Sequence, residues 1–102
     1  MRISVYCSSA PDIDPAHLQL AYEIGKGIGQ RGWDLVWGGG AISMMGAVAR
    51  GTREHGGKTF GVIPTKLLQL EIEDKDSTEI IEVDSMRTRK AKIEELSDAF
   101  IA

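Results

Sequence analysis

The chain has 102 residues, a length that fits one small domain, and its 42% hydrophobic and 26% charged residues are ordinary for a globular protein. A formal net charge of −3 argues against a general nucleic-acid or membrane-surface binder, because such proteins usually carry a basic excess. The single cysteine, Cys7, excludes an internal disulfide, and no Cys/His cluster has zinc-ligand spacing. Neither a signal peptide nor a membrane-length apolar run is evident, so we expect a cytoplasmic protein.

Short apolar, β-branched runs alternate with helix-like segments along the whole chain. We expect strands at 2–7, 34–37, 59–63, 79–83 and 99–102. We expect helices at about 14–31, 43–55 and 85–96, one or two helical turns at 65–70, and an exposed acidic loop at 71–78. This alternation predicts right-handed βαβ units and an α/β fold with a Rossmann-like parallel sheet flanked by helices.

Local signals mark several helix ends. Asp14 and Pro15 are typical of a helix start, and Ser43 and Ser85 are good N-cap residues for the later helices. Glycines follow the first two helices in the C′ position, and Pro64 is expected to stop the third strand. The first helix carries small residues on its apolar face, which would let it lie close to the sheet.

The chain ends within the expected fifth strand. A strand of a parallel sheet is normally covered by the helix that follows it, and here none follows. We therefore expect residues 1–102 to be the incomplete, C-terminally truncated part of a single domain whose final strand and helices lie beyond residue 102. We also expect an exposed apolar sheet face.

A glycine-rich turn, Trp37-Gly-Gly-Gly-Ala-Ile-Ser-Met-Met-Gly46, connects the second strand to the second helix. Backbone N–H groups and the helix dipole favour an anion at such a helix start, and glycines let a ligand approach the main chain closely. The carboxyl ends of parallel strands meet at one edge of the sheet, which is where open α/β sheets bind ligands. An unliganded strand-to-helix connection is the alternative interpretation.

The glycine spacing does not fit the standard nucleotide motifs. A dinucleotide fingerprint follows the first strand, whereas these glycines follow the second, and Ser43 takes the third glycine position counted from Gly38. The next strand end, Gly61-Val-Ile-Pro64, offers no carboxylate for a ribose. A P-loop needs lysine and a hydroxyl after its last glycine, and Gly46-Ala-Val48 has neither.

Cations gather at the start of the last helix. Arg87, Arg89 and Lys90 lie in its first turns while Glu94 and Glu95 lie near its end, which is opposite to the order that the helix dipole favours. An anionic group held between these cations and the glycine turn explains this order. A solvated helix face with an i,i+4 pair between Lys90 and Glu94 is the alternative.

Together these stretches resemble the LONELY GUY family of cytokinin riboside 5′-monophosphate phosphoribohydrolases, many of which were once labelled possible lysine decarboxylases. The matching residues are Val5-Tyr-Cys-Ser-Ser9, Gly38-Gly-Gly-Ala-Ile-Ser-Met-Met-Gly46, Gly56-Gly57, Gly61-Val-Ile-Pro64, Glu71, Met86-Arg-Thr-Arg-Lys90 and Ser97-Asp-Ala-Phe-Ile-Ala102. Ser43 departs from the glycine of many members. The family's Pro-Gly-Gly-x-Gly-Thr-x-x-Glu segment, which binds phosphate and supplies a catalytic glutamate, would follow Ala102.

The resemblance implies a nucleotide-binding domain and an activity. The activity is hydrolysis of the N-glycosidic bond of adenine-type, N6-prenylated nucleoside 5′-monophosphates to free base and ribose 5-phosphate, which activates cytokinins. The reaction needs no cofactor and no metal, and passes through an oxocarbenium-like ribose. The resemblance also implies a homodimer and a small-molecule partner, with no nucleic acid or membrane. It makes Arg89 the catalytic arginine and assigns substrate binding to Ser9, Gly38, Gly39, Gly40, Met45, Gly46, Glu71, Arg89 and Lys90.

Two other interpretations remain open, and a third, the decarboxylase, is disfavoured. The chain could be a non-catalytic nucleotide-binding module of the same fold, or an inactive fragment. The decarboxylase label requires pyridoxal phosphate on a lysine, and neither Lys58 nor Lys66 has a sequence context typical of an aldimine site.

The lone residues Cys7, His17 and His55 are interpreted as structural.

Overall fold

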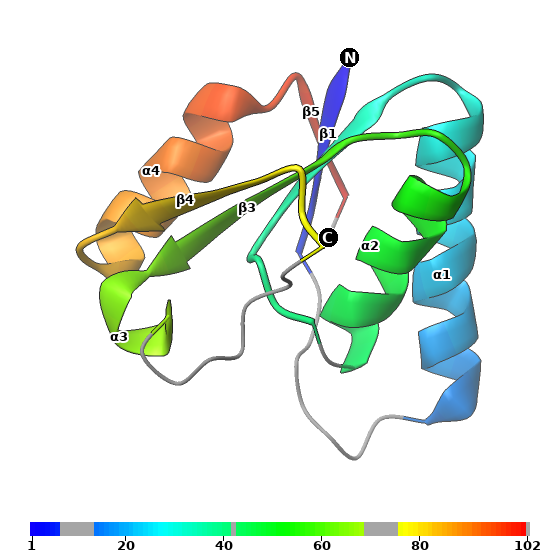
Figure 1. Ribbon diagram of the computed structural model, residues 1–102, viewed down its shortest axis with the longest axis horizontal. Helices are drawn as coiled ribbons and strands as arrows, with labels where there is room; N and C mark the ends of the chain where they lie inside the picture. Colours follow the sequence, from blue (N-terminus) through cyan, green and yellow to red (C-terminus); the bar gives the residue numbers. More distant parts are fainter. Residues whose placement is uncertain (7–13, 42, 69–75, 102) are drawn as a thin grey trace.

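The computed structural model describes residues 1–6, 14–41, 43–68 and 76–101, which form one five-stranded sheet with helices on both sides (Figure 1). The strands are β1 (Arg2–Val5), β2 (Asp34–Trp37), β3 (Thr59–Pro64), β4 (Glu79–Val83) and β5 (Ala99–Ile101). The helices are α1 (Pro15–Gln30), α2 (Ser43–Glu54), α3 (Thr65–Leu68) and α4 (Met86–Leu96). The expected parallel α/β architecture is confirmed.

The sheet has the order β4-β3-β2-β1-β5, and every neighbouring pair of strands is parallel. The chain therefore builds outward from β1 to β4 and then returns through α4 to place β5 on the other side of β1. Helices α1 and α2 cover one face of the sheet and α4 covers the other (Figure 1). The carboxyl ends of β2, β3 and β4 lead into the glycine turn, α3 and α4, so these three connections share one edge, as the sequence predicts.

Two apolar clusters hold the layers together. On the α1 and α2 side, Leu35 and Trp37 of β2 pack with Val48 of α2, and all three are fully buried. On the α4 side, Val62 of β3 packs with Ile93 of α4. The alternation of side chains along β2 divides this strand between the two cores, since Val36 lies in the second.

The small residues of α1 contact α2 rather than the sheet, which corrects the sequence prediction. A Cβ added at Gly25 would lie 2.1 Å from the Val48 carbonyl oxygen, and one at Gly29 would lie 2.7 Å from the Thr52 carbonyl oxygen. From the other side, a Cβ at Gly51 would lie 2.3 Å from the Tyr22 carbonyl oxygen. The two helix backbones are therefore in direct contact, which a periodicity on one helix alone does not reveal.

Most local signals are confirmed at the helix ends. The Asp14 carboxylate accepts a hydrogen bond from the Ala16 N–H at 2.8 Å, and Ser85 Oγ accepts one from the Thr88 N–H at 3.1 Å. Gly32 and Gly56 have φ of +72° and +94°, the left-handed conformation of helix C-terminal glycines. Pro64, expected to stop β3, is instead its last residue and aligns with Val83 of β4; proline is tolerated at such an end because little of the ladder lies beyond it.

An apolar surface is exposed beside β5, as expected. Phe100 is 52% exposed and Ile101 is 37% exposed, and Phe100 stacks on Tyr6 with ring centroids 6.3 Å apart. A shallow hollow of about 400 Å³ lies between this strand and α1, and Ile24 and Trp33 are among its lining residues. None of the helices in the described ranges is long and apolar enough to cross a membrane.

Tyr22 links α1 to α2 and gives the fold a predictable response to alkaline pH. Its hydroxyl donates a 2.6 Å hydrogen bond to Glu54 Oε1, and this bond, followed by desolvation, raises the pKa of Tyr22 above its ordinary value of 10.0. Because the folded state holds this proton more tightly, the stabilisation is present below about pH 10 and is lost as the pH rises further. Tyr22→Phe should therefore be less stable than the unmodified chain at neutral pH, and the gap should close above about pH 10. Urea unfolding across this range measures the gap; a constant difference would contradict the assignment.

Candidate functional site

A small hollow lies at the carboxyl edge of the sheet, beside the ends of β1 and β2. It has a volume of about 130 Å³ and is formed by the end of β1, the glycine turn, α2 and α4. Its lining residues are Val5, Tyr6, Gly38, Met45, Met86, Arg89, Lys90 and Ile93. The structure thus brings together four residues that the sequence places in the site, namely Gly38, Met45, Arg89 and Lys90.

The glycine turn leaves β2 in a tight path against β3. The Trp37 indole Nε1 donates a 3.1 Å hydrogen bond to the Gly40 carbonyl, and both residues are buried. Gly39 has φ of +81°, which glycine adopts without steric cost. A Cβ on Gly61 of β3 would lie 2.7 Å from Gly39 Cα, so the two backbones meet there directly. Packing therefore requires glycine at these positions.

The start of α2 is tightly packed too. A Cβ at Gly46 would lie 2.2 Å from the Ala41 carbonyl oxygen, and one at Gly40 would lie 2.8 Å from Met45 Sδ. Met45 therefore lies between the turn and the hollow. These contacts place Gly39, Gly40 and Gly46 in the wall that supports the site, while Gly38 and Met45 line it directly.

Ser43 does not act as the predicted N-cap. It is the first residue of α2 and has φ of +56°, the left-handed region that glycine favours. An N-cap residue needs a conformation outside the helix in which its oxygen meets the first N–H groups, typically an extended one. Within the described part of the chain, the buried Ser43 hydroxyl has no hydrogen-bond partner. This conformation also explains why glycine suits the position in the family that the motifs resemble.

Arg89 reaches from α4 across the exits of β2 and β3. Its Nε donates a 2.8 Å hydrogen bond to the Val62 carbonyl, its Nη2 donates to the Gly38 carbonyl, and its Nη1 contacts Met86 Sδ at 3.7 Å. Burial lowers the pKa of this guanidinium, which nevertheless remains protonated at neutral pH. No carboxylate within the described ranges is bonded to it, so a bound anion would meet an uncompensated positive charge.

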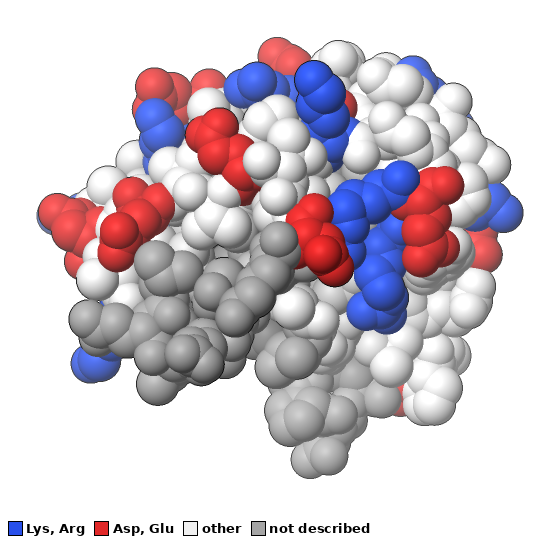
Figure 2. All heavy atoms as spheres, in the orientation of Figure 1, with Lys and Arg blue, Asp and Glu red and all other residues white. Residues whose placement is uncertain are grey.

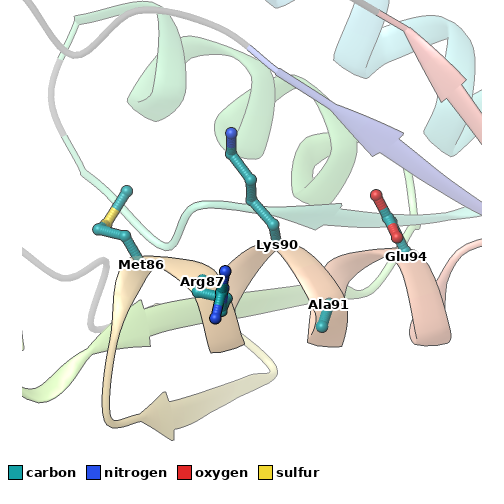
Figure 3. A pocket seen from close by; sticks show the side chains of 5 residues that line it. All are labelled: Met86, Arg87, Lys90, Ala91 and Glu94. Carbon is teal, nitrogen blue, oxygen red and sulfur yellow. The ribbon is translucent and has the colours of Figure 1, made fainter.

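Lys90 borders the hollow from the same helix and is exposed. The i,i+4 pair with Glu94, which was the alternative to an anion site, is not formed; Figure 3 shows the two side chains leaving α4 without meeting. The ion pair on this helix instead joins Lys92 to Glu95 at 3.6 Å. Lys90 is thus available to a ligand.

A second, shallower hollow lies on the outer side of α4 and has a volume of about 420 Å³ (Figure 3). It is lined by Met86, Arg87, Lys90, Ala91 and Glu94. We call this one the outer hollow and the first one, between the glycine turn and α4, the inner hollow. Because Met86 and Lys90 line both hollows, the first turn of α4 separates them.

Four lining residues were not among the predicted site residues. Val5, Met86 and Ile93 border the hollow, and so does Tyr6. Its position directly after β1, at the carboxyl edge, was the signal that could have identified it. Ser9 and Glu71, both predicted to bind substrate, lie outside the described residues.

Charge is mixed on the visible surface of the molecule. Figure 2 shows Lys and Arg interspersed with Asp and Glu over the described part of the face seen in Figure 1, with no broad basic area there. In the described ranges, no group of three or more His, Cys, Asp or Glu residues could hold a metal ion. The cations that matter for a ligand are therefore local to the start of α4.

An open parallel α/β sheet with a glycine turn and two cations at its carboxyl edge defines a Rossmann-like protein with a site suited to a small anionic ligand. Residues 45–102 match a protein family described as "Possible lysine decarboxylase". The chain belongs to this family, which is the LONELY GUY family that its motifs resemble.

Curated relatives agree with this assignment, and a solved structure agrees with the fold. The chain is 50% identical over 99 residues to a cytokinin riboside 5′-monophosphate phosphoribohydrolase of Mycobacterium tuberculosis, covering 97% of this chain and 52% of the relative. It is 46% identical, with the same coverage, to the protein of that name from Mycobacterium marinum. The molybdenum cofactor carrier protein of Chlamydomonas reinhardtii matches with a TM-score of 0.82 and 26% identity over 97% of this chain and 59% of that one. The chain thus spans about half the length of the curated relatives it matches.

Proposed function

We propose that the protein carrying this chain hydrolyses the N-glycosidic bond of adenine-type nucleoside 5′-monophosphates, N6-prenylated ones in particular, and releases free base and ribose 5-phosphate. The observation that carries the proposal is the hollow at the carboxyl edge, where Arg89 and Lys90 border an otherwise largely apolar lining. Its chemistry suits a ligand with one anionic end and one flat, weakly polar end. The names of the mycobacterial relatives support the same substrate class.

The residues of the hollow have distinct roles in this proposal. Lys90 supplies a mobile, exposed ammonium that can neutralise a phosphate oxygen. Arg89 has a half-buried guanidinium and directs Nη1 to a contact with only a weak sulfur acceptor, so this nitrogen can turn to a ligand. Met45 and Tyr6 offer apolar and aromatic surface for the base. As the family resemblance implies, a glutamate would stabilise the oxocarbenium-like ribose and orient water.

Arg89→Ala tests the enzymatic proposal. In the protein that carries this chain, the variant should release base from AMP or prenyl-AMP at least about a hundredfold more slowly, because a charged group that contacts the reacting nucleotide is lost. Chromatography of free base and ribose 5-phosphate measures the rate. Arg87→Ala is the matched control, since Arg87 lies on the same helix turn and borders only the outer hollow. Unchanged turnover in Arg89→Ala would remove Arg89 from the mechanism.

A second candidate is binding without hydrolysis. It is favoured by the likeness to the Chlamydomonas reinhardtii carrier of molybdenum cofactor, a protein named for carrying its ligand. A chain of this kind would bind AMP in the same hollow and release no base. Isothermal titration with AMP, run beside the turnover assay, separates the two candidates. Sequencing the gene beyond Ala102 is a further test, because finding a Pro-Gly-Gly-x-Gly-Thr-x-x-Glu segment there would favour the enzyme.

Decarboxylation, the reaction in the family's description, is not proposed. Pyridoxal phosphate would need a lysine beside an enclosed site. Lys58 is exposed and precedes β3 at the opposite edge of the sheet, and Lys66 is exposed on α3. Neither residue borders the inner hollow.

A further inference from the structure

The ladder between β2 and β3 stops abruptly beside the site. The last paired residues are Trp37 and Gly61, and the next residues along, Gly38 and Val62, are not paired with each other. Both are buried, so their carbonyl oxygens are shielded from water at the point where the strands part. A buried carbonyl without a partner is costly, so a hydrogen-bond donor must occupy the place where the two strands part.

The Arg89 guanidinium takes that place. It donates from Nε to the Val62 carbonyl at 2.8 Å and from Nη2 to the Gly38 carbonyl, so one planar group joins the exits of both strands. Gly38 is shaped for this contact, because a Cβ there would lie 2.4 Å from Nη2. Lysine cannot reproduce the arrangement, since its compact ammonium lacks the fixed fork of a guanidinium.

We propose that Arg89 is a positioning residue for the glycine turn, in addition to any contact that it makes with a ligand. By bonding one carbonyl from each strand exit, it bridges β2 and β3 beside the hollow and fixes the path of residues 38–40. The N–H groups of Nη1 and the second N–H of Nη2 then remain for a ligand. The ligand contact rests on the proposed function, whereas the positioning of the turn does not.

Trp37 is a built-in reporter of the turn, because its indole N–H bonds the Gly40 carbonyl. The chain has two tryptophans, and Trp33 lies beside Arg31, near the hollow between α1 and β5. In ¹H–¹⁵N spectra of the 102-residue chain without ligand, Arg89→Lys and Arg89→Gln should shift the Trp37 indole signal and speed its hydrogen exchange at least about tenfold. The Trp33 signal should stay in place. Arg87→Gln, on the same helix turn, should change neither signal.

Rescue makes the test specific to the guanidinium group. Guanidinium ion at millimolar concentration should restore the Trp37 signal of Arg89→Ala, and ammonium ion should not. An unchanged Trp37 signal in both Arg89→Lys and Arg89→Gln would overturn the proposal. Collapse of both indole signals in these variants would also overturn it, because Arg89 would then support the whole fold rather than the turn.

A separate AMP titration keeps this proposal distinct from the proposed function. If the protein carrying this chain neither binds nor hydrolyses AMP, the proposed function fails while the ligand-free Trp37 result stands. If AMP binds and the Trp37 indole signal does not change in the Arg89 variants, the positioning role fails while the proposed function stands.

Discussion

Gly25→Ala should lower the free energy of unfolding by about 3 kcal/mol, since its new methyl group has no room between α1 and α2. The added Cβ would lie 2.1 Å from the Val48 carbonyl oxygen and 3.0 Å from the Thr52 nitrogen. Both are backbone atoms of α2, so no side chain can turn away to relieve the overlap, and the helices must separate. For a chain of this size, such a loss is a large part of the total stability.

Gly27→Ala is the matched control on the same helix. Its Cβ would meet only the end of the flexible Arg31 side chain, at 3.1 Å from Nη1. Alanine is the better helix former, so this variant should gain about 0.5–1 kcal/mol. Urea unfolding followed by circular dichroism measures both changes. Equal stabilities for the two variants would show that α1 and α2 do not touch through Gly25.

Gly38→Ala should weaken AMP binding at least about tenfold while the sheet stays folded. The methyl group would lie 2.4 Å from Arg89 Nη2 and 2.8 Å from Met45 Cε, so it displaces two side chains that line the inner hollow. The guanidinium is the less free of the two, because it is bonded to carbonyls on both strands. The variant thus changes the shape and the charge position of the site together.

Gly40→Ala is the comparison within the same turn. The atoms nearest to its Cβ all belong to the Met45 side chain, with Sδ at 2.8 Å, and a thioether can adopt another rotamer. AMP affinity should therefore fall by less than in Gly38→Ala, with circular dichroism of both variants unchanged. If Gly40→Ala lowers AMP affinity more than Gly38→Ala does, the site depends on Met45 more than on the position of Arg89.

Local patterns were sufficient to predict the elements of the fold. Strand β2 and helix α4 follow the expected bounds because an apolar run, a serine cap and the next strand signal leave little choice of ending. The parallel sheet follows from the alternation itself. Local patterns could not predict which surfaces of two helices contact each other. The glycines of α1 were therefore assigned to the sheet.

The grouping of the candidate site residues was also predicted in part, because some of its contacts follow from the fold and others do not. Gly38, Met45, Arg89 and Lys90 share a hollow because the carboxyl ends of parallel strands share an edge. The partners of Arg89 lie 27 and 51 residues away in sequence and are backbone carbonyls, which carry no residue signature. The left-handed φ of Ser43 was missed because serine is usually read as a cap, and only the packed turn imposes the other conformation.

The contact between α1 and α2 also determines which side of the site can adapt to a ligand. Two helices joined through their backbones move as one rigid body, so the end of the turn that enters α2 is fixed to the bulk of the domain. The opposite wall is a single helix, α4, connected to the turn through one side chain. If the site adjusts to a ligand, we expect α4 to move and the start of α2 to provide the fixed surface.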